Sequence, residues 1–170
     1  MAYVGLGGNL GDRLATLRTA VGRLGASGGI SVESASSVYE TEALIRPESD
    51  PQPHHLNAVA GLRTGLPPLA LLDLFKRLEV EAGRDLDAPP WSARPLDLDL
   101  LLYGEEVVDE PTLQVPHPEL SVRRFVLVPL ADVAAHQRVP GIGKTVAEIL
   151  AECPDPLHVR RTTHRLTLSR

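Results

Sequence analysis

Two periods alternate in the pattern of apolar and polar positions along the first hundred residues. Apolar side chains recur every three or four residues after Asp12 and again after Pro67, which is the spacing of one helix face. Between these segments, short apolar or strictly alternating runs have the period of a strand. A bulge is expected at 34–37, where weak strand formers follow one another. The pattern predicts helices over 12–24 and 67–82, and strands over 2–6, 30–39, 54–64 and 96–103.

Two strand–helix–strand passes with mostly short links predict the fold class. We expect an α+β ferredoxin-like sandwich, with a mainly antiparallel sheet and both long helices packed on one face. Further on, Thr145 and Glu148 have the spacing of a capping box, which predicts a helix that ends near Ala151. A short strand is expected at 107–108. The basic tail, residues 158–170, is expected to be a solvated end of the chain.

The strand predicted over 96–103 carries two aspartates on one face. Asp97 and Asp99 are two residues apart, so their Cα atoms would lie about 6.5–7 Å apart on the same side of the strand. Mg²⁺ is typically held by one or two such carboxylates together with substrate phosphates. Arg94 precedes the strand and could clamp those phosphates. The alternative is an ordinary half-buried strand whose aspartates face water. A site is favoured because neighbouring buried carboxylates repel unless a cation compensates.

Composition restricts the class of protein. The 170 residues predict a single domain over 1–170, with a globular balance of 43% hydrophobic and 23% charged residues. A formal net charge of −5 disfavours a nucleic-acid partner. A single cysteine, Cys153, allows neither an internal disulfide nor a multi-cysteine zinc site. No signal-peptide pattern or membrane-length apolar run is found, so we expect a cytoplasmic protein, acting as a monomer and without a membrane partner.

Three better-known motifs do not fit. The glycines at 5 and 7 lack the third glycine of the dinucleotide fingerprint, since Leu10 stands there. The run PGIGKT at 140–145 resembles the end of a P-loop, but Arg138 occupies the position of its first glycine and no buried strand leads into it. His117 has no histidine partner at ligand spacing, so a structural or substrate-contacting role is favoured over zinc binding.

Taken together, the motifs resemble those of the 6-hydroxymethyl-7,8-dihydropterin pyrophosphokinases. The resemblance runs from Tyr3 to about Leu150, and its most specific part is the arginine with the paired aspartates. It implies a folate-biosynthesis enzyme that transfers the β,γ-diphosphate of ATP to the pterin hydroxymethyl group and releases AMP. The matching segments are LGGNLGD at 6–12, Val38 to Thr41, Leu56 to Ala58, Glu79, Gly83-Arg84, Trp91, Arg94 to Asp99, Val115 to His117, Arg123 and Phe125 to Leu127.

The resemblance also implies roles for individual residues. Asp97 and Asp99 would hold two Mg²⁺ ions, and Arg84 and Arg94 would steady the transferring group. Pterin contacts are implied for Thr41, Leu44, His55, Asn57, Trp91 and Phe125. ATP contacts are implied for Lys76, Glu79, Arg84, Arg94, Leu100, Thr112, His117 and Arg123.

The chain departs from the family pattern in three places. Ser92-Ala93 replaces Gly-Pro, Asp85 and Asp87 replace basic residues, and Glu42-Ala43 replaces prolines. From the residues alone, two other functions stay open: a metal-dependent nucleotidyl transferase or cyclase, which would release pyrophosphate, and a non-catalytic ligand-binding domain. The nucleotide product formed from ATP, Mg²⁺ and the reduced pterin alcohol separates all three.

Overall fold

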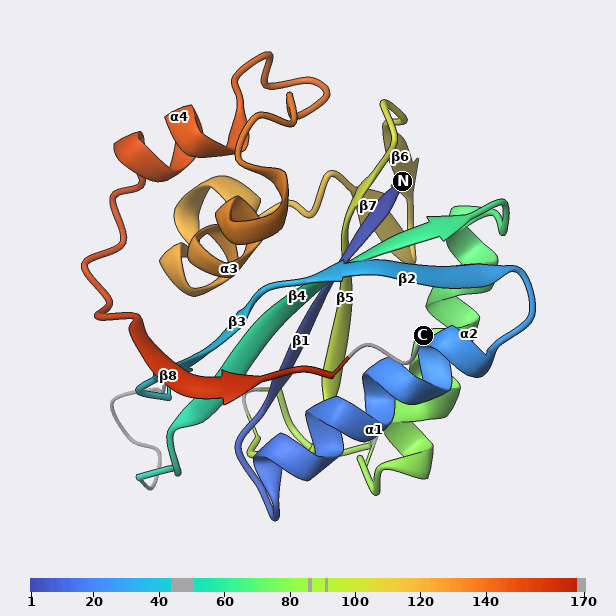
Figure 1. Cartoon of the computed structure of the whole chain (residues 1–170), viewed down its shortest axis with the longest axis vertical. Coiled ribbons are helices and arrows are strands. Elements are labelled where there is room, and N and C mark those ends of the chain that lie inside the picture. Colours follow the sequence, from blue (N-terminus) through green and yellow to red (C-terminus); the bar gives the residue numbers. More distant parts are fainter. Residues whose placement is uncertain (44–50, 86, 91, 168–170) are drawn as a thin grey trace.

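A six-stranded antiparallel sheet forms the centre of the molecule (Figure 1). The computed structural model describes residues 1–43, 51–85, 87–90 and 92–167. The sheet order is β5-β1-β4-β3-β8, and β2 also pairs with β4. The sheet and helix bounds are β1 Ala2–Gly8, α1 Arg13–Ala26, β2 Ile30–Ala35, β3 Ser37–Thr41, β4 His55–Thr64, α2 Pro68–Glu81, β5 Asp97–Tyr103, α3 Arg124–Ala134, α4 Val146–Glu152 and β8 Arg160–Arg165. A small hairpin, β6 Val108–Glu110 with β7 Leu113–Val115, and a 3₁₀ turn, η1 Leu120–Val122, follow β5.

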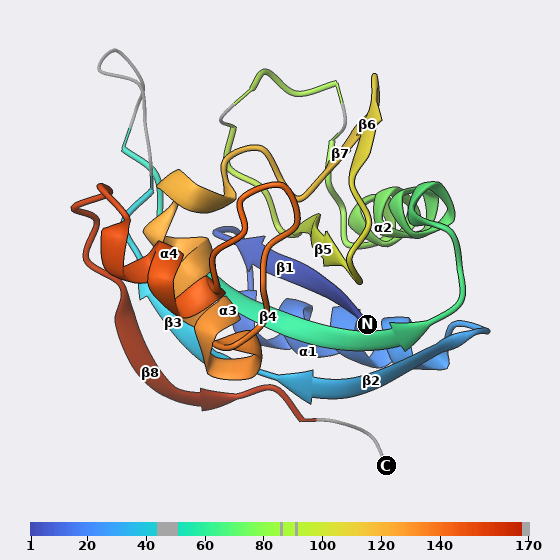
Figure 2. The same ribbon diagram turned by 90° about the horizontal axis from the view of Figure 1, so that it is seen from above.

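The sheet is covered on both faces (Figures 1 and 2). Alternate residues of β4, from Leu56 to Leu62, pack with α1 and α2, as the pattern of the sequence predicts. Val59 and Leu101, which point the other way, pack with α3 and α4. The expectation of helices on one face is therefore confirmed for the two long helices, while α3 is a helix that the pattern did not predict. Pro129 lies inside α3, and proline disfavours helix interiors.

The strand predicted over 30–39 is divided into β2 and β3 at Ser36, within the stretch where a bulge was expected. The backbone of Ser36 still bonds to β4, because Ser36 N donates to Val59 O at 2.8 Å. Its hydroxyl accepts from Val59 N at 2.9 Å. The break lets β2 and β3 pair with successive parts of β4.

The described part of the basic tail is not a free end, and this corrects the expectation for residues 158–167. Residues 160–165 form β8, the edge strand next to β3. Leu166, which follows it, is 7% exposed and belongs to the core shared with α1. The arginine side chains stay largely in solvent, and Arg160 pairs with Glu40. Among the described residues, no helix is long and apolar enough to cross a membrane.

The turn after β1 holds two loops against the sheet. Asn9 is 1% exposed, and its backbone N–H donates to Arg94 O at 2.9 Å while its Oδ1 accepts from Arg94 N at 2.8 Å. Asn9 Nδ2 donates to Gln52 Oε1 at 3.1 Å and to Pro53 O at 3.2 Å. The loop before β4 and the chain entering β5 therefore meet at one buried amide.

Gly8 makes this close approach possible, so we predict that Gly8→Ala destabilises the fold. A Cβ at Gly8 would lie 2.2 Å from Pro95 O, a backbone atom that cannot move alone. We expect the free energy of unfolding to fall by about 1–3 kcal/mol, the usual cost of overpacking. Urea denaturation measures the change. The control is Gly22→Ala on α1, where nothing lies within 4 Å of the added atom; equal stability of the two variants would contradict the prediction.

Candidate functional site

A cavity of about 430 Å³ opens where β1, β4 and β5 meet the start of α3. A second cavity of about 670 Å³ adjoins it between α2, β5 and the β6–β7 hairpin. Lys76, Asp99 and His117 line both. The first cavity gathers the predicted residues Thr41, His55, Asn57, Lys76, Arg84, Arg94, Asp97, Asp99, His117, Arg123 and Phe125, and the second adds Leu100 and Thr112.

Three of the predicted residues are not assigned to either cavity. Leu44 and Trp91 lie outside the described residues. Glu79 lines neither cavity, because its side chain is completely buried beneath the start of β5. A direct contact between Glu79 and a nucleotide stays a prediction, and the contacts of Glu79 point to another role.

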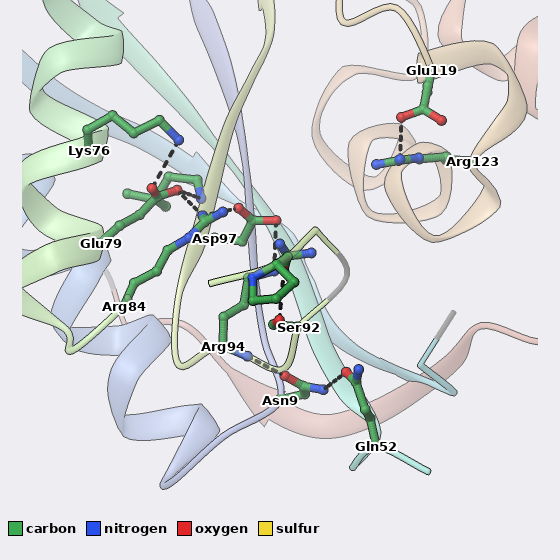
Figure 3. Close-up of polar contacts among 12 residues, drawn as sticks. Asn9, Gln52, Lys76, Glu79, Arg84, Ser92, Arg94, Asp97, Glu119 and Arg123 are labelled. Atoms are coloured by element: carbon green, nitrogen blue, oxygen red, sulfur yellow. Dashed lines mark hydrogen bonds and ion pairs between the residues drawn. The ribbon is translucent and has the colours of Figure 1, made fainter. Parts of the chain in front are cut away.

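The Glu79 carboxylate links α2 to β5 and to two cations (Figure 3). Its Oε1 accepts from Leu98 N at 2.8 Å and lies 2.8 Å from Arg84 Nη1. Its Oε2 accepts from Lys76 Nζ at 3.1 Å. A buried carboxylate is stable only when its charge is paired and its oxygens are hydrogen-bonded, and both conditions are met here. Glu79 therefore positions Arg84 and Lys76, which do line the cavity.

Asp97 is paired with both predicted arginines. Arg84 Nη1 bridges Glu79 and Asp97, donating a hydrogen bond to Asp97 Oδ1 (Figure 3). Arg94 Nε lies 3.3 Å from Asp97 Oδ2, close enough for an ion pair. That contact lacks hydrogen-bond geometry, and Arg94 Nε is the one buried side-chain nitrogen or oxygen without a hydrogen-bond partner in the described part of the chain. An unpaired buried guanidinium N–H beside the cavity suits an anionic ligand such as a phosphate.

Asp99 is the carboxylate without an adjacent arginine. Burial, then the charges of Asp97 and Glu79, raise the pKa of Asp99 to about 7, while Arg123 and Lys76 act in the opposite direction. A carboxylate that resists ionisation at neutral pH is one that a bound cation would stabilise. Among the described residues no three acidic, histidine or cysteine side chains form a metal cluster. Two carboxylates facing a cavity fit Mg²⁺, which retains waters and phosphate ligands, better than a metal that needs a full protein cage.

The pterin-side residues belong to three elements. Asn57 on β4 is 7% exposed, and its Nδ2 donates to Thr41 Oγ1 on β3 at 2.9 Å. This bond fixes the amide and leaves its Oδ1 and second N–H for a ligand. Gly7 faces Asn57, since a Cβ there would lie 3.2 Å from Asn57 Oδ1. On α3, the Phe125 ring has the Arg123 guanidinium 5.7 Å from its centroid.

His117 stands at the junction of the two cavities. Burial, then the neighbouring Arg123, lower the pKa of His117, so the ring is neutral. Its Nδ1 accepts from Glu119 N at 3.2 Å. The proton of the neutral ring is therefore on Nε2, which makes His117 a hydrogen-bond donor there.

Sequence reasoning missed several residues of the site. Gly5 and Gly7 form part of the cavity wall, although the glycine-rich opening is a weak motif by itself. Glycine inside a predicted strand often marks a place where a ligand or another backbone approaches closely, so these two glycines could have been predicted as site residues. Glu42 and Gln52 also line the cavity. No sequence pattern predicted that Asn9 holds Arg94, because the two are far apart along the chain.

Comparison with known proteins decides the family. A sequence model of the family described as 7,8-dihydro-6-hydroxymethylpterin-pyrophosphokinase matches residues 3–135. The chain belongs to this family. Two relatives named 2-amino-4-hydroxy-6-hydroxymethyldihydropteridine pyrophosphokinase illustrate the match. That of Pseudomonas aeruginosa is 40% identical over 89% of this chain and 91% of its own. That of a Synechocystis strain is 39% identical over 89% of this chain and 75% of its own.

Solved structures agree on the fold. The pyrophosphokinase region of a bifunctional Plasmodium falciparum protein, HPPK-DHPS, superposes with a TM-score of 0.67 at 15% identity. The match covers 89% of this chain and 42% of the bifunctional one. The ferredoxin-like α+β fold predicted from the sequence is confirmed.

Family membership establishes the reaction. The protein is an ATP- and Mg²⁺-dependent pyrophosphokinase of folate biosynthesis. It transfers the β,γ-diphosphate of ATP to the hydroxymethyl group of 6-hydroxymethyl-7,8-dihydropterin and releases AMP. The two other functions left open by the residues, a cyclase or nucleotidyl transferase and a non-catalytic domain, are therefore excluded.

The charge state of His55 gives a testable pH dependence. Burial, then Arg94, lower the pKa of His55 to about 4, although Asp97 acts to raise it. Because the folded-state pKa lies below the unfolded value, His55 stabilises the fold above about pH 6.5, and this stability is lost as the pH falls through 4. We expect the His55 ring to titrate near pH 4 by NMR. A His55 midpoint above pH 6 would contradict the structure.

Proposed function

We propose that pterin and ATP occupy the two adjoining cavities, with their reacting ends meeting at Lys76, Asp99 and His117, which line both. The pterin occupies the smaller cavity beside Asn57 and Phe125, and the nucleotide occupies the larger one beside Leu100 and Thr112. This assignment is supported by the residues that the cavities share, because the transferred diphosphate must contact both substrates.

Two Mg²⁺ ions are proposed at Asp97 and Asp99, where they would neutralise the ATP phosphates. The observation that carries this proposal is that Asp97 and Asp99, two residues apart on β5, both line the first cavity, and only Asp97 is paired with arginines. Arg84 already supplies positive charge at Asp97. When the phosphates bind, Arg84 is expected to leave Asp97 for them, while Glu79 keeps it close by.

The remaining residues position and shield the reactants. Asn57 orients the pterin edge with its free amide atoms, and the neutral His55 and Phe125 form the walls. His117 Nε2–H and Arg123 are placed to donate to the triphosphate. Diphosphate transfer depends on positioning and charge neutralisation more than on a strong base, so this set of side chains is sufficient. Leu44 and Trp91 keep their proposed pterin contacts.

The loop after α2 is one of the three places where the chain departs from the family pattern. Asp85 Oδ1 accepts from Asp87 N at 2.9 Å, so one of the two acidic side chains stabilises a turn of the loop itself. The monomeric state, the cytoplasmic location and the absence of nucleic-acid and membrane partners stay predictions. Light scattering and cell fractionation would test the first two.

Loss of the charge on either aspartate should remove most activity. Asp97→Asn and Asp99→Asn keep the side-chain shape but lose a metal ligand, so we expect the turnover number to fall by roughly 100-fold or more, the scale on which single electrostatic groups act in catalysis. Circular dichroism and thermal unfolding should show a folded protein, since relief of carboxylate repulsion offsets lost contacts. AMP formation measured by chromatography gives the rate. Near-normal turnover in either variant would exclude its role as a metal ligand.

Loss of the Asn57 amide should affect the pterin alone. Asn57→Ala leaves the pterin edge and Thr41 Oγ1 without their partner, which should weaken pterin binding by about 1–3 kcal/mol. ATP affinity should stay unchanged, because Asn57 does not line the second cavity. Titration calorimetry with each substrate distinguishes the cases. An equal loss of affinity for both substrates would show a folding defect instead.

A further inference from the structure

Helix α3 carries site residues at its first turn but does not cap that turn itself. Phe125 is the second residue of α3, and Arg123 directly precedes the helix. Arg123 is the N-cap residue and makes no side-chain cap bond, and the first turn contains no acidic residue. The first N–H groups of a helix need acceptors from elsewhere.

The first turn of α3 is also weakened from within. Pro129 has no N–H, so the carbonyl of Phe125 lacks the donor that would normally come four residues later. The far end of the helix is fixed more firmly. Asp132 Oδ2 accepts from Ser37 N at 3.0 Å and from Tyr39 OH at 2.9 Å, which ties α3 to β3. If an outside contact at the first turn were lost, the Phe125 end would therefore move while the Asp132 end stayed.

That outside contact comes from Asp155. Its Oδ2 accepts from Arg124 N, the first N–H of α3, at 2.9 Å, and its Oδ1 accepts from Leu157 N at 2.9 Å. The second bond holds the carboxylate in the orientation that the first requires. Asp155 lies in the connection between α4 and β8, which runs beside α3 (Figure 1). The residues matched by the family model end at 135, so this cap is supplied from beyond them.

We propose that Asp155 is a positioning residue for pterin, because it caps α3 and thereby sets the place of the Phe125 ring. The inference rests on the proposed role of Phe125 as a wall of the pterin site. Arg123 should be affected less, because it is held from outside the helix by its ion pair with Glu119 (Figure 3). Asp155 therefore acts on pterin binding more than on ATP binding.

The test compares steady-state kinetics of four variants: Asp155→Ala, Asp155→Asn, Phe125→Ala and the double variant Asp155→Ala/Phe125→Ala. We expect Asp155→Ala to raise the KM for pterin by about fivefold, within the range of helix-cap losses. The KM for ATP and kcat should each change less than twofold. Asp155→Asn leaves one acceptor oxygen for the two backbone N–H groups, so we expect it to retain only part of the pterin affinity.

The matched control is Thr145→Ala, which removes the cap of α4, a helix that does not line either cavity. It should lower the melting temperature about as much as Asp155→Ala does but leave the KM for pterin unchanged. If both cap variants have the same kinetics, Asp155 is merely structural and the inference is wrong.

The double variant tests whether Asp155 acts through Phe125. The KM for pterin should then match that of Phe125→Ala alone, since there is no ring left to position. Additive effects would overturn the inference. If Phe125→Ala itself leaves the KM for pterin unchanged, the proposed role of Phe125 fails, and that outcome is separate from a failure of Asp155 alone.

Discussion

Three carboxylates lie together at the start of β5, and the site depends on the cations that compensate them. Glu79 is fully buried, and Asp97 and Asp99 are half-buried beside it. Their mutual repulsion in a low-dielectric interior would be destabilising without Lys76, Arg84 and Arg94. Burial and the other two carboxylates still raise the pKa of Asp99, although Arg123 and Lys76 act to lower it. The two carboxylates that line the cavity, Asp97 and Asp99, are therefore suited to a metal–triphosphate complex.

The contacts of these three carboxylates assign a structural role to Glu79 and a chemical role to Asp97 and Asp99. Glu79 also accepts from Leu98 N, so it fixes α2 to β5 as well as holding Arg84. Removal of its carboxylate would leave the buried Leu98 N–H unpaired, take from Lys76 its partner on α2 and leave Arg84 with Asp97, a loss of several kcal/mol. Asp97 and Asp99 make fewer contacts that hold the fold together, and both line the cavity. Replacement of Glu79 should therefore damage folding, whereas replacement of the aspartates damages the reaction.

Sequence patterns predicted the parts of the fold that local period and capping specify. The face of β4 that alternates from Leu56 to Leu62, the Asp12 cap of α1 and the Thr145–Glu148 box are all present. Patterns failed where long-range contacts override local preference. Helix α3 contains Pro129 and is stabilised by Asp132 and Asp155, and β8 is rich in exposed arginine but is paired with β3.

The same limit applies to the site. The period of two placed Asp97 and Asp99 on one face, and the family resemblance supplied most other lining residues. Neither could reveal that Arg84 is shared between Glu79 and Asp97, because that geometry depends on the packing of α2 against β5.

Long-range contacts connect the walls of the two cavities through the backbone. Asn9 joins the turn after β1 to Arg94 and to the loop before β4, which leads into His55. On the opposite side, Asp132 holds α3 against β3, and Asp155 holds the first turn of α3, which carries Phe125, to the α4–β8 connection. Each connection passes through one polar side chain whose partners lie far away in sequence. A small displacement of one of these side chains would therefore shift the loop or helix end that it holds, and with it the residues that line the site. The precision of the diphosphate transfer is built on these few contacts as much as on the residues that touch the substrates.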